Sequence, residues 1–227
     1  MENYSCEQLY DIIEDEILCL KICPGEVLSE NILCERFGIS RTPARTILQR
    51  LQDNGLVEIK PYKGCLVRLL NFDVINQIIY QRLAVECMVL GEFMDICTPV
   101  DIERVRHAYL ELAACLQAGE LDENRFYDAD SRMHEIWFKT MRKMYLFQQF
   151  RADKSDYKRF AMLDVGCEDS MREIVAEHAQ ILAMIEQGRR AEIIPVMKLH
   201  LYGGIRRVGN DVFTKYAAFF SDIESAE

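Results

Sequence analysis

The stretch SRTPARTILQRLQDNGLVEIKPYKGCLV, residues 40–67, decides the fold class of the first part of the chain. Its first half places apolar residues at helical spacing and ends in Asn54-Gly55, a pair that commonly stops a helix. The pattern then changes to two short extended runs, 56–60 and 65–69, on either side of a turn that contains glycine. The stretch therefore predicts one helix followed by a two-stranded hairpin.

Two further helices are expected before this stretch. Apolar residues follow helical spacing over residues 4–20 and stop before a turn signal that includes Pro24. Ser29 is a suitable N-cap for a second, short helix that ends at Gly38, where glycine can adopt the left-handed cap conformation. Three helices followed by a hairpin predict a winged helix-turn-helix domain over residues 1–70.

The rest of the chain, residues 71–227, contains no clear strand signal and predicts an all-helical bundle of about six or seven amphipathic helices. We therefore expect a mainly α protein with two domains, joined near residues 69–73. The expected helices lie near 74–96, 99–118, 122–141, 144–162, 168–187 and 190–207, followed by a shorter tail helix.

The composition is that of a globular protein. With 227 residues, half of them apolar, the chain is long enough to bury a sizeable core. It contains no run of about twenty apolar residues, and its acidic N-terminus lacks the basic and then apolar pattern of a secretory signal. Nine cysteines, an odd number without a CxxC pair, favour reduced thiols over a disulfide framework or a zinc ribbon. We expect a cytoplasmic protein that does not enter a membrane.

Basic residues are concentrated near the quoted stretch, although the formal net charge of the whole chain is -10. Residues 36–68 carry seven Lys or Arg and two acidic residues. On the helix of the quoted stretch, the apolar face pushes Arg41, Thr42 and Arg45 to the opposite side. Arginine can bind guanine O6 and N7 with two donors, and Ser40, Thr42 and the free amides of the first turn suit a phosphate. This face predicts a DNA-reading helix; a basic face that only meets solvent is the alternative.

Polar side chains interrupt the apolar stripes of the predicted helical domain. Asp130 and His134 lie one turn apart on the inward face of one helix. His178 and His200 lie on the buried stripes of two others. Each histidine taken alone is most simply explained as a core imidazole bonded to a backbone carbonyl. Burying the carboxylate and the three imidazoles together requires a partner for each, and one divalent cation satisfies all four.

Imidazole and carboxylate ligands suit Zn, Ni, Mn, Co or Fe. Four protein ligands on a six-coordinate ion leave two positions for water or for the carboxylate of a small molecule. The remaining histidine, His107, lies in a charged stretch and is expected at the surface.

Residues 24–67, PGEVLSENILCERFGISRTPARTILQRLQDNGLVEIKPYKGCLV, resemble the GntR family of bacterial transcription regulators. The turn, the two helices, Asn54-Gly55 and the wing glycine all occur in register. The chain departs from the family pattern at Asn31, where members often carry a further basic residue. The resemblance implies DNA contacts from the second of these helices and from the wing tip, by Ser40, Arg41, Thr42, Arg45, Lys63 and Gly64.

The C-terminal part resembles the FCD domain of the FadR subfamily, which implies a divalent metal at the floor of a pocket that binds small organic acids. Arg82 also falls on an inward stripe, where it either helps to neutralise the carboxylate of the effector or pairs only with an acidic residue such as Glu86. The motifs that carry the resemblance are Asp130 to His134, Glu177-His178 and His200-Leu201 for the metal, and Arg82 with Glu86 for the effector.

Two departures from this second pattern concern the pocket. Arg142-Lys143-Met144 stands where an Asn is usual, which is expected to alter a turn or the pocket rim. Pro195 lies within helical reach of His200 and is expected to kink the helix that presents this ligand.

Together these features predict a homodimeric, metal-containing transcription regulator that is not an enzyme. Two recognition helices and two wings would read a pseudo-palindromic, double-stranded DNA operator, because one small module provides too few contacts. A small organic acid bound at the metal would change the packing of the helical domain, and repression released by the acid is the more usual arrangement. Two alternatives remain open: a metal-dependent enzyme that acts on a small carboxylate, and a constitutive DNA binder with a structural metal.

Overall fold

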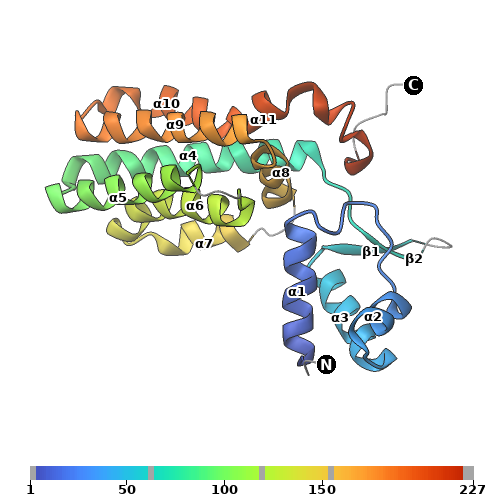
Figure 1. Cartoon of the computed structure of the whole chain (residues 1–227). Helices are drawn as coiled ribbons and strands as arrows, with labels where there is room; N and C mark the ends of the chain where they lie inside the picture. Colours follow the sequence, from blue (N-terminus) through green and yellow to red (C-terminus); the bar gives the residue numbers. More distant parts are fainter. Residues whose placement is uncertain (1–3, 61–63, 118–120, 153–155, 222–227) are drawn as a thin grey trace. The chain divides into compact units, whose positions relative to one another are not determined.

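The chain folds into two compact units in the computed structural model, which describes residues 4–60, 64–117, 121–152 and 156–221 (Figure 1). The first unit contains the residues up to Phe72 and the segment that begins at Asn210. The second unit is Asp73–Gly209. The predicted mainly α fold class is confirmed, because the only sheet in the described residues is the two-stranded hairpin.

The first unit contains the predicted winged helix-turn-helix. Its strands pair antiparallel, with Val57 opposite Val67 and Lys60 opposite Gly64. Its elements are α1 (Cys6–Leu18), α2 (Glu30–Phe37), α3 (Arg41–Asp53), β1 (Val57–Lys60) and β2 (Gly64–Val67).

Local signals in the sequence set the helix ends of this unit. Ser5 forms a capping box with Gln8 at the start of α1, and the Ser29 hydroxyl accepts a hydrogen bond from the Ile32 amide at the start of α2. Gly38 ends α2 with a φ of 65°, which a residue with a Cβ rarely adopts. The apolar stripes then meet in one buried core that includes Leu9, Ile13, Ile17, Leu33, Ala44, Ile47, Leu51, Val57 and Val67.

The second unit is a bundle of helices. None of the helices in the described part of the chain combines the length and the apolar character that crossing a bilayer requires. The helices are α4 (Phe72–Ile96), α5 (Pro99–Cys115), α6 (Glu123–Thr140), α7 (Met144–Ala152), α8 (Asp156–Val165), α9 (Glu168–Glu186), the short 3-10 turn η1 (Arg190–Glu192), α10 (Ile193–Leu201) and α11 (Gly203–Val208).

Two of the predicted helices are divided. The range 144–162 contains α7 and the first part of α8, and the range 190–207 contains η1, α10 and most of α11. The second division falls at Tyr202, next to Gly203, where a Cβ would lie 2.6 Å from Arg207 Nη1 and 2.9 Å from Glu177 Oε1, so the position requires glycine. Pro195 lies in the first turn of α10, where its missing N–H costs no helical hydrogen bond, so the expected kink before His200 is absent.

The C-terminal segment returns to the first unit, whereas the sequence placed it in the second domain. It contains the 3-10 turns η2 (Gly209–Val212) and η3 (Ala217–Phe219) in place of the expected tail helix. Phe220 forms a parallel β-bridge with Leu70, and the Ser221 amide donates to the Leu70 carbonyl at 2.9 Å. The rings of Phe220 and Phe72 also meet edge to face at 6.2 Å. These long-range contacts have no local sequence signal.

Arg142 occupies a left-handed position at the end of α6, with a φ of 56°. The Lys143 amide donates to the Phe138 carbonyl at 2.8 Å and the Arg142 amide donates to the Lys139 carbonyl at 3.1 Å, which together form a Schellman cap. The turn therefore forms although the usual Asn is missing. Arg142, which has a Cβ, adopts a backbone conformation there that favours glycine.

We expect Arg142→Gly to raise the free energy of unfolding by about 1 kcal/mol relative to Arg142→Ala, because glycine removes the backbone strain. Urea denaturation of both variants measures this difference. The alanine variant is the control, since it removes the same charged side chain and keeps the strain. Equal stability of the two variants would contradict a strained cap.

Candidate metal centre and nucleic-acid interface

The four predicted metal ligands converge in the second unit. Asp130 and His134 come from α6, one helical turn apart, while His178 comes from α9 and His200 from α10. One ligand atom from each residue lies within 4.8 Å of the others. The three imidazoles are buried, and the Asp130 side chain is 22% exposed. The helical stripes therefore bring together residues that are up to 70 positions apart in the sequence.

Each of the three imidazoles has an oxygen acceptor at its Nδ1 atom. An acceptor at Nδ1 places the ring proton there, which leaves Nε2 of a neutral imidazole with a free lone pair. The pairs are His134 with Glu86 Oε2 at 2.5 Å, His200 with Glu177 Oε2 at 3.1 Å, and His178 with the carbonyl oxygen of Ile174 at 2.9 Å.

The three Nε2 atoms face one another and Asp130. Nε2 of His134 and Nε2 of His200 are 3.1 Å apart, and Nε2 of His178 is 3.3 Å from Asp130 Oδ1. Nε2 of His178 is buried and makes no hydrogen bond within the described residues, although this carboxylate is close. Lone pairs that face each other at these distances repel, and a cation among them would turn the repulsion into coordination. The donor set therefore fits a divalent metal.

Burial favours the neutral form of His178 and His200, which is the form that binds metals. Burial, followed by the proximity of His178 and His134, lowers the pKa of His200 well below its usual value. Burial also lowers the pKa of His178, against the opposing charge of Asp130. Glu86 shows the opposite balance: burial favours its neutral acid, but Arg82 and His134 outweigh burial and lower its pKa to about 2. Glu86 is thus an anion that can hold the Nδ1 proton of His134.

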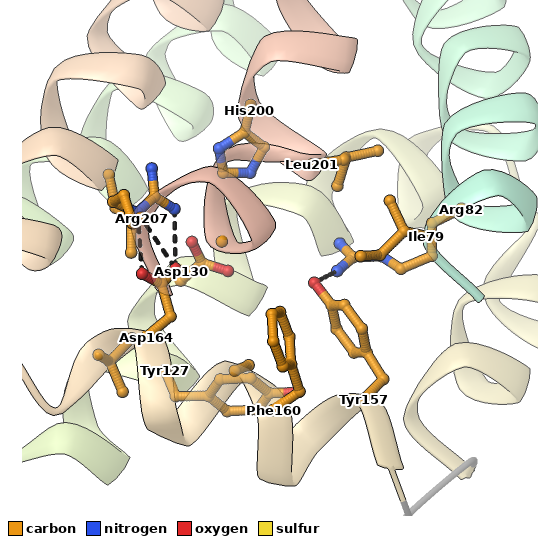
Figure 2. Close-up of a pocket in the computed structure, with 14 residues that line it drawn as sticks. Ile79, Arg82, Tyr127, Asp130, Tyr157, Phe160, Asp164, His200, Leu201 and Arg207 are labelled. Carbon is orange, nitrogen blue, oxygen red and sulfur yellow. Dashed lines mark hydrogen bonds and ion pairs between the residues drawn. The ribbon is translucent and has the colours of Figure 1, made fainter. Parts of the chain in front are cut away.

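A cavity of about 50 Å³ lies next to the four ligands (Figure 2). Asp130 and His200 line it together with Arg82, the predicted effector residue. Arg82 Nε donates to Glu86 Oε1 at 2.7 Å, and its Nη1 donates to the Tyr157 hydroxyl. Arg82 therefore pairs with Glu86, as one of the two expectations required, and it also lines the cavity; its contact with an effector stays a prediction.

The sequence did not predict the charged pair Asp164 and Arg207 of this pocket, which also involves Glu177 of the Glu177-His178 motif. Arg207 lines the cavity and donates from Nε and Nη2 to Asp164, at 2.9 and 2.8 Å. Its Nη1 donates to Glu177 Oε1 at 2.7 Å, and Glu177 also accepts from His200. The available signal was weak, because charged residues in short helices near the chain end resemble surface residues in the sequence.

Four of the predicted DNA contacts lie at the exposed N-terminal end of α3. Ser40 is its N-cap, and the hydroxyl makes no capping hydrogen bond, while Arg41 and Thr42 begin the helix. The Arg45 side chain is 75% exposed, and its Nε donates to Glu30 Oε1 at 2.9 Å. These side chains are accessible to a nucleic acid.

The remaining two predicted DNA contacts lie at the wing. Gly64 begins β2 and is exposed, whereas Lys63 lies outside the described residues. Another basic residue of α3 makes contacts at the surface of the same unit: the Arg50 guanidinium lies 3.9 Å from the centre of the Tyr10 ring and pairs with Glu7. Arg50 is therefore part of the packing of α3 against α1.

Comparisons with known proteins agree with this architecture. The family model described as bacterial regulatory proteins, gntR family, matches residues 6–67, and the FCD domain model matches residues 77–203, more than half of the chain. The chain belongs to the GntR family. The family description names regulatory proteins and the relatives are named as transcription regulators, which argues against the enzymatic alternative.

Several GntR relatives are similar to this chain over different lengths. The HTH-type transcriptional repressor RspR of Escherichia coli is 27% identical over 130 residues, which are 57% of this chain and 56% of RspR. The chain thus matches little more than half of the length of that relative. The galactonate operon transcriptional repressor of Escherichia coli is 27% identical over 196 residues, 76% of this chain and 83% of that protein. The crystal structure of a GntR regulator from Rhodococcus sp. RHA1 shares the fold, with a TM-score of 0.68, 19% identity, and coverage of 90% of this chain and 97% of that chain.

Proposed function

We propose that this GntR regulator is a homodimeric repressor whose affinity for its operator is controlled by a small organic acid bound at a divalent metal. The observation that carries the proposal is the convergence of three imidazole lone pairs and one carboxylate beside a cavity. The family supplies the DNA-binding activity, and the repressors among the relatives support the direction of control.

The residues that would hold the metal are Asp130, His134, His178 and His200. Zn, Ni, Mn, Co and Fe are the ions that suit these ligands. When bound, the ion supplies a positive charge that attracts a carboxylate. Glu86 and Glu177 orient His134 and His200 by accepting their Nδ1 protons in hydrogen bonds. Mutation of such hydrogen-bond partners commonly lowers metal affinity by about 10–100-fold.

Arg82 would bind the carboxylate of the acid from the α4 side of the cavity. Glu86 holds its Nε, which fixes the direction of the guanidinium. Its Nη2 makes no hydrogen bond within the described residues and remains free to donate to a ligand. A charge-assisted hydrogen bond of this kind is about twice as strong as a neutral one.

The DNA contacts would come from Ser40, Arg41, Thr42 and Arg45 on α3 and from Lys63 and Gly64 at the wing. Arg41 and Arg45 are one helical turn apart, so both can reach base edges in one major groove. Two copies of the chain would read the two halves of a pseudo-palindromic operator, and the double contact provides the discrimination that one module lacks.

Two covalent connections can transmit the bound state of the pocket to the DNA-binding unit. The chain passes between the units at Phe72–Asp73 and again at Gly209–Asn210. Leu70 precedes α4, which carries Arg82, and Phe220 follows α11, which carries Arg207. The β-bridge between Leu70 and Phe220 therefore joins the segment that leads into α4 to the segment that follows α11.

We expect Phe220→Ala to reduce the effect of the acid on operator affinity. Coupling of about 1–3 kcal/mol typically changes the affinity 5–150-fold, and the variant should show little or no change. The variant should keep its metal and bind the acid, because Phe220 lies outside the second unit. Fluorescence anisotropy of a labelled operator with and without acid measures the response. Phe213→Ala is the matched control, since Phe213 belongs to the same segment and is 52% exposed. A full response in the Phe220 variant would argue against this connection.

The proposed function as a whole is tested by native mass spectrometry and DNA binding. The purified protein should appear as a dimer with one metal ion per chain, and an operator selected from a random DNA pool should be released when the correct acid is added. Thermal shift with a panel of organic acids identifies that acid, because a ligand that binds the folded state raises the melting temperature. Metal without any acid effect would favour the alternative of a structural ion in a constitutive DNA binder.

A further inference from the structure

We propose that the acid is a short aliphatic monocarboxylate with at most one further oxygen substituent, and that di- and tricarboxylates and polyhydroxy acids are excluded. This inference rests on the proposed function, because it names the chemical class that the same cavity accepts. Its basis is the size of the cavity, the pairing of its two arginines and the character of its walls.

The size of the cavity sets the first limit. Its volume is about 50 Å³. One water needs about 10–15 Å³ on this scale, so this cavity accommodates about three to five non-hydrogen atoms, the size of an acid of two or three carbon atoms. A sugar acid or a tricarboxylic acid is too large to bind without a rearrangement of the walls.

The pairing of the two arginines sets the second limit. Arg82 and Arg207 are the arginines among the lining residues, and no lysine lines the cavity in the described part of the chain. Nε and Nη2 of Arg207 donate to Asp164 (Figure 2), and its Nη1 donates to Glu177, so two carboxylates offset the charge of this guanidinium. Arg82 keeps a free Nη2. One cationic side chain is thus available in addition to the metal, and a second carboxylate on the ligand would be buried without a partner, which costs several kcal/mol.

The character of the walls sets the third limit. The Tyr157 hydroxyl accepts from Arg82, so its own proton can be donated to one oxygen of a ligand. A chain of several hydroxyl groups would meet apolar carbon and lose hydrogen bonds to water. The apolar lining residues are Ile79, Phe160, Ala161, Val165, Ile174 and Leu201.

Isothermal titration calorimetry of the zinc-loaded, full-length protein tests the class directly. We expect propanoate or glycolate to bind at least about tenfold more tightly than malonate, citrate and gluconate, because these three bury unpartnered polar groups. Tighter binding of any of these three acids would overturn the inference and leave the proposed function in place. Failure of every acid to bind would overturn both.

A single substitution should change the specificity. Asp164→Asn keeps the size of the side chain and removes the charge that holds Arg207, so we expect the affinity for malonate relative to propanoate to rise at least about fivefold. The double variant Asp164→Asn/Arg207→Met is the matched control and should lose this gain. A folded single variant without the gain would overturn the role assigned to Arg207. Should the single variant not fold, the ligand series on the unmodified protein decides the inference.

Discussion

His134→Ala is expected to remove the metal from the protein and, with it, the response of DNA binding to acid. His134 is central to the proposed site, because its Nε2 lies 3.1 Å from Nε2 of His200 and its Nδ1 is held by Glu86. Replacing residues that hydrogen-bond to metal ligands costs about 10–100-fold in metal affinity, so the loss of a ligand itself should cost more than about 100-fold. Metal content after dialysis, measured by inductively coupled plasma mass spectrometry, reports the loss.

The matched control for this prediction is His107→Ala. The His107 side chain is 73% exposed on α5, away from the four ligands, so this variant removes an imidazole and should keep its full metal content. Nonspecific DNA binding by the His134 variant shows that the DNA-binding unit still folds. A His134 variant that retains one metal ion per chain would refute the proposed ligand set.

Arg45→Ala is expected to weaken binding to the selected operator by about 1–3 kcal/mol, or roughly 5–150-fold, and to relax the preference for one base pair. The Arg45 side chain is exposed near the start of α3, where a recognition helix meets base edges. Its ion pair with Glu30 must open or reorient when DNA binds, and this exposed pair is weak enough to allow the exchange. Anisotropy titrations with the operator and with a scrambled duplex measure the two effects.

Arg36→Ala provides the control for charge. Arg36 also pairs with a carboxylate, Glu16, but it lies in the last turn of α2. Both variants lose one positive charge, so a general electrostatic effect would weaken them equally. Equal losses on the operator and on the scrambled duplex for Arg45→Ala would show that Arg45 contacts phosphate instead of a base, and no loss on either would show that it faces solvent.

Much of the fold follows from local patterns. Capping residues such as Ser29 and Gly38 act within one or two helical turns, and the change from helical to extended spacing after Gly55 lies within a few residues. For the same reason the inward positions of Asp130 and His134 could be read from the spacing on one helix. The need for glycine at position 203 could not, because it depends on the close approach of Glu177 from another helix.

The sequence alone determined which side of each helix is buried, because helical periodicity is a property of neighbouring residues. It therefore placed three imidazoles and one carboxylate in the interior of the second unit and Arg45 on the surface of the first unit. Only the tertiary structure decided which groups meet there. Glu86 holds His134 across 48 residues, Asp164 and Glu177 together occupy Arg207, and Phe220 returns to Leu70 across 150. Such partners come from the packing of separate segments, and periodicity carries no information about which helix lies opposite another.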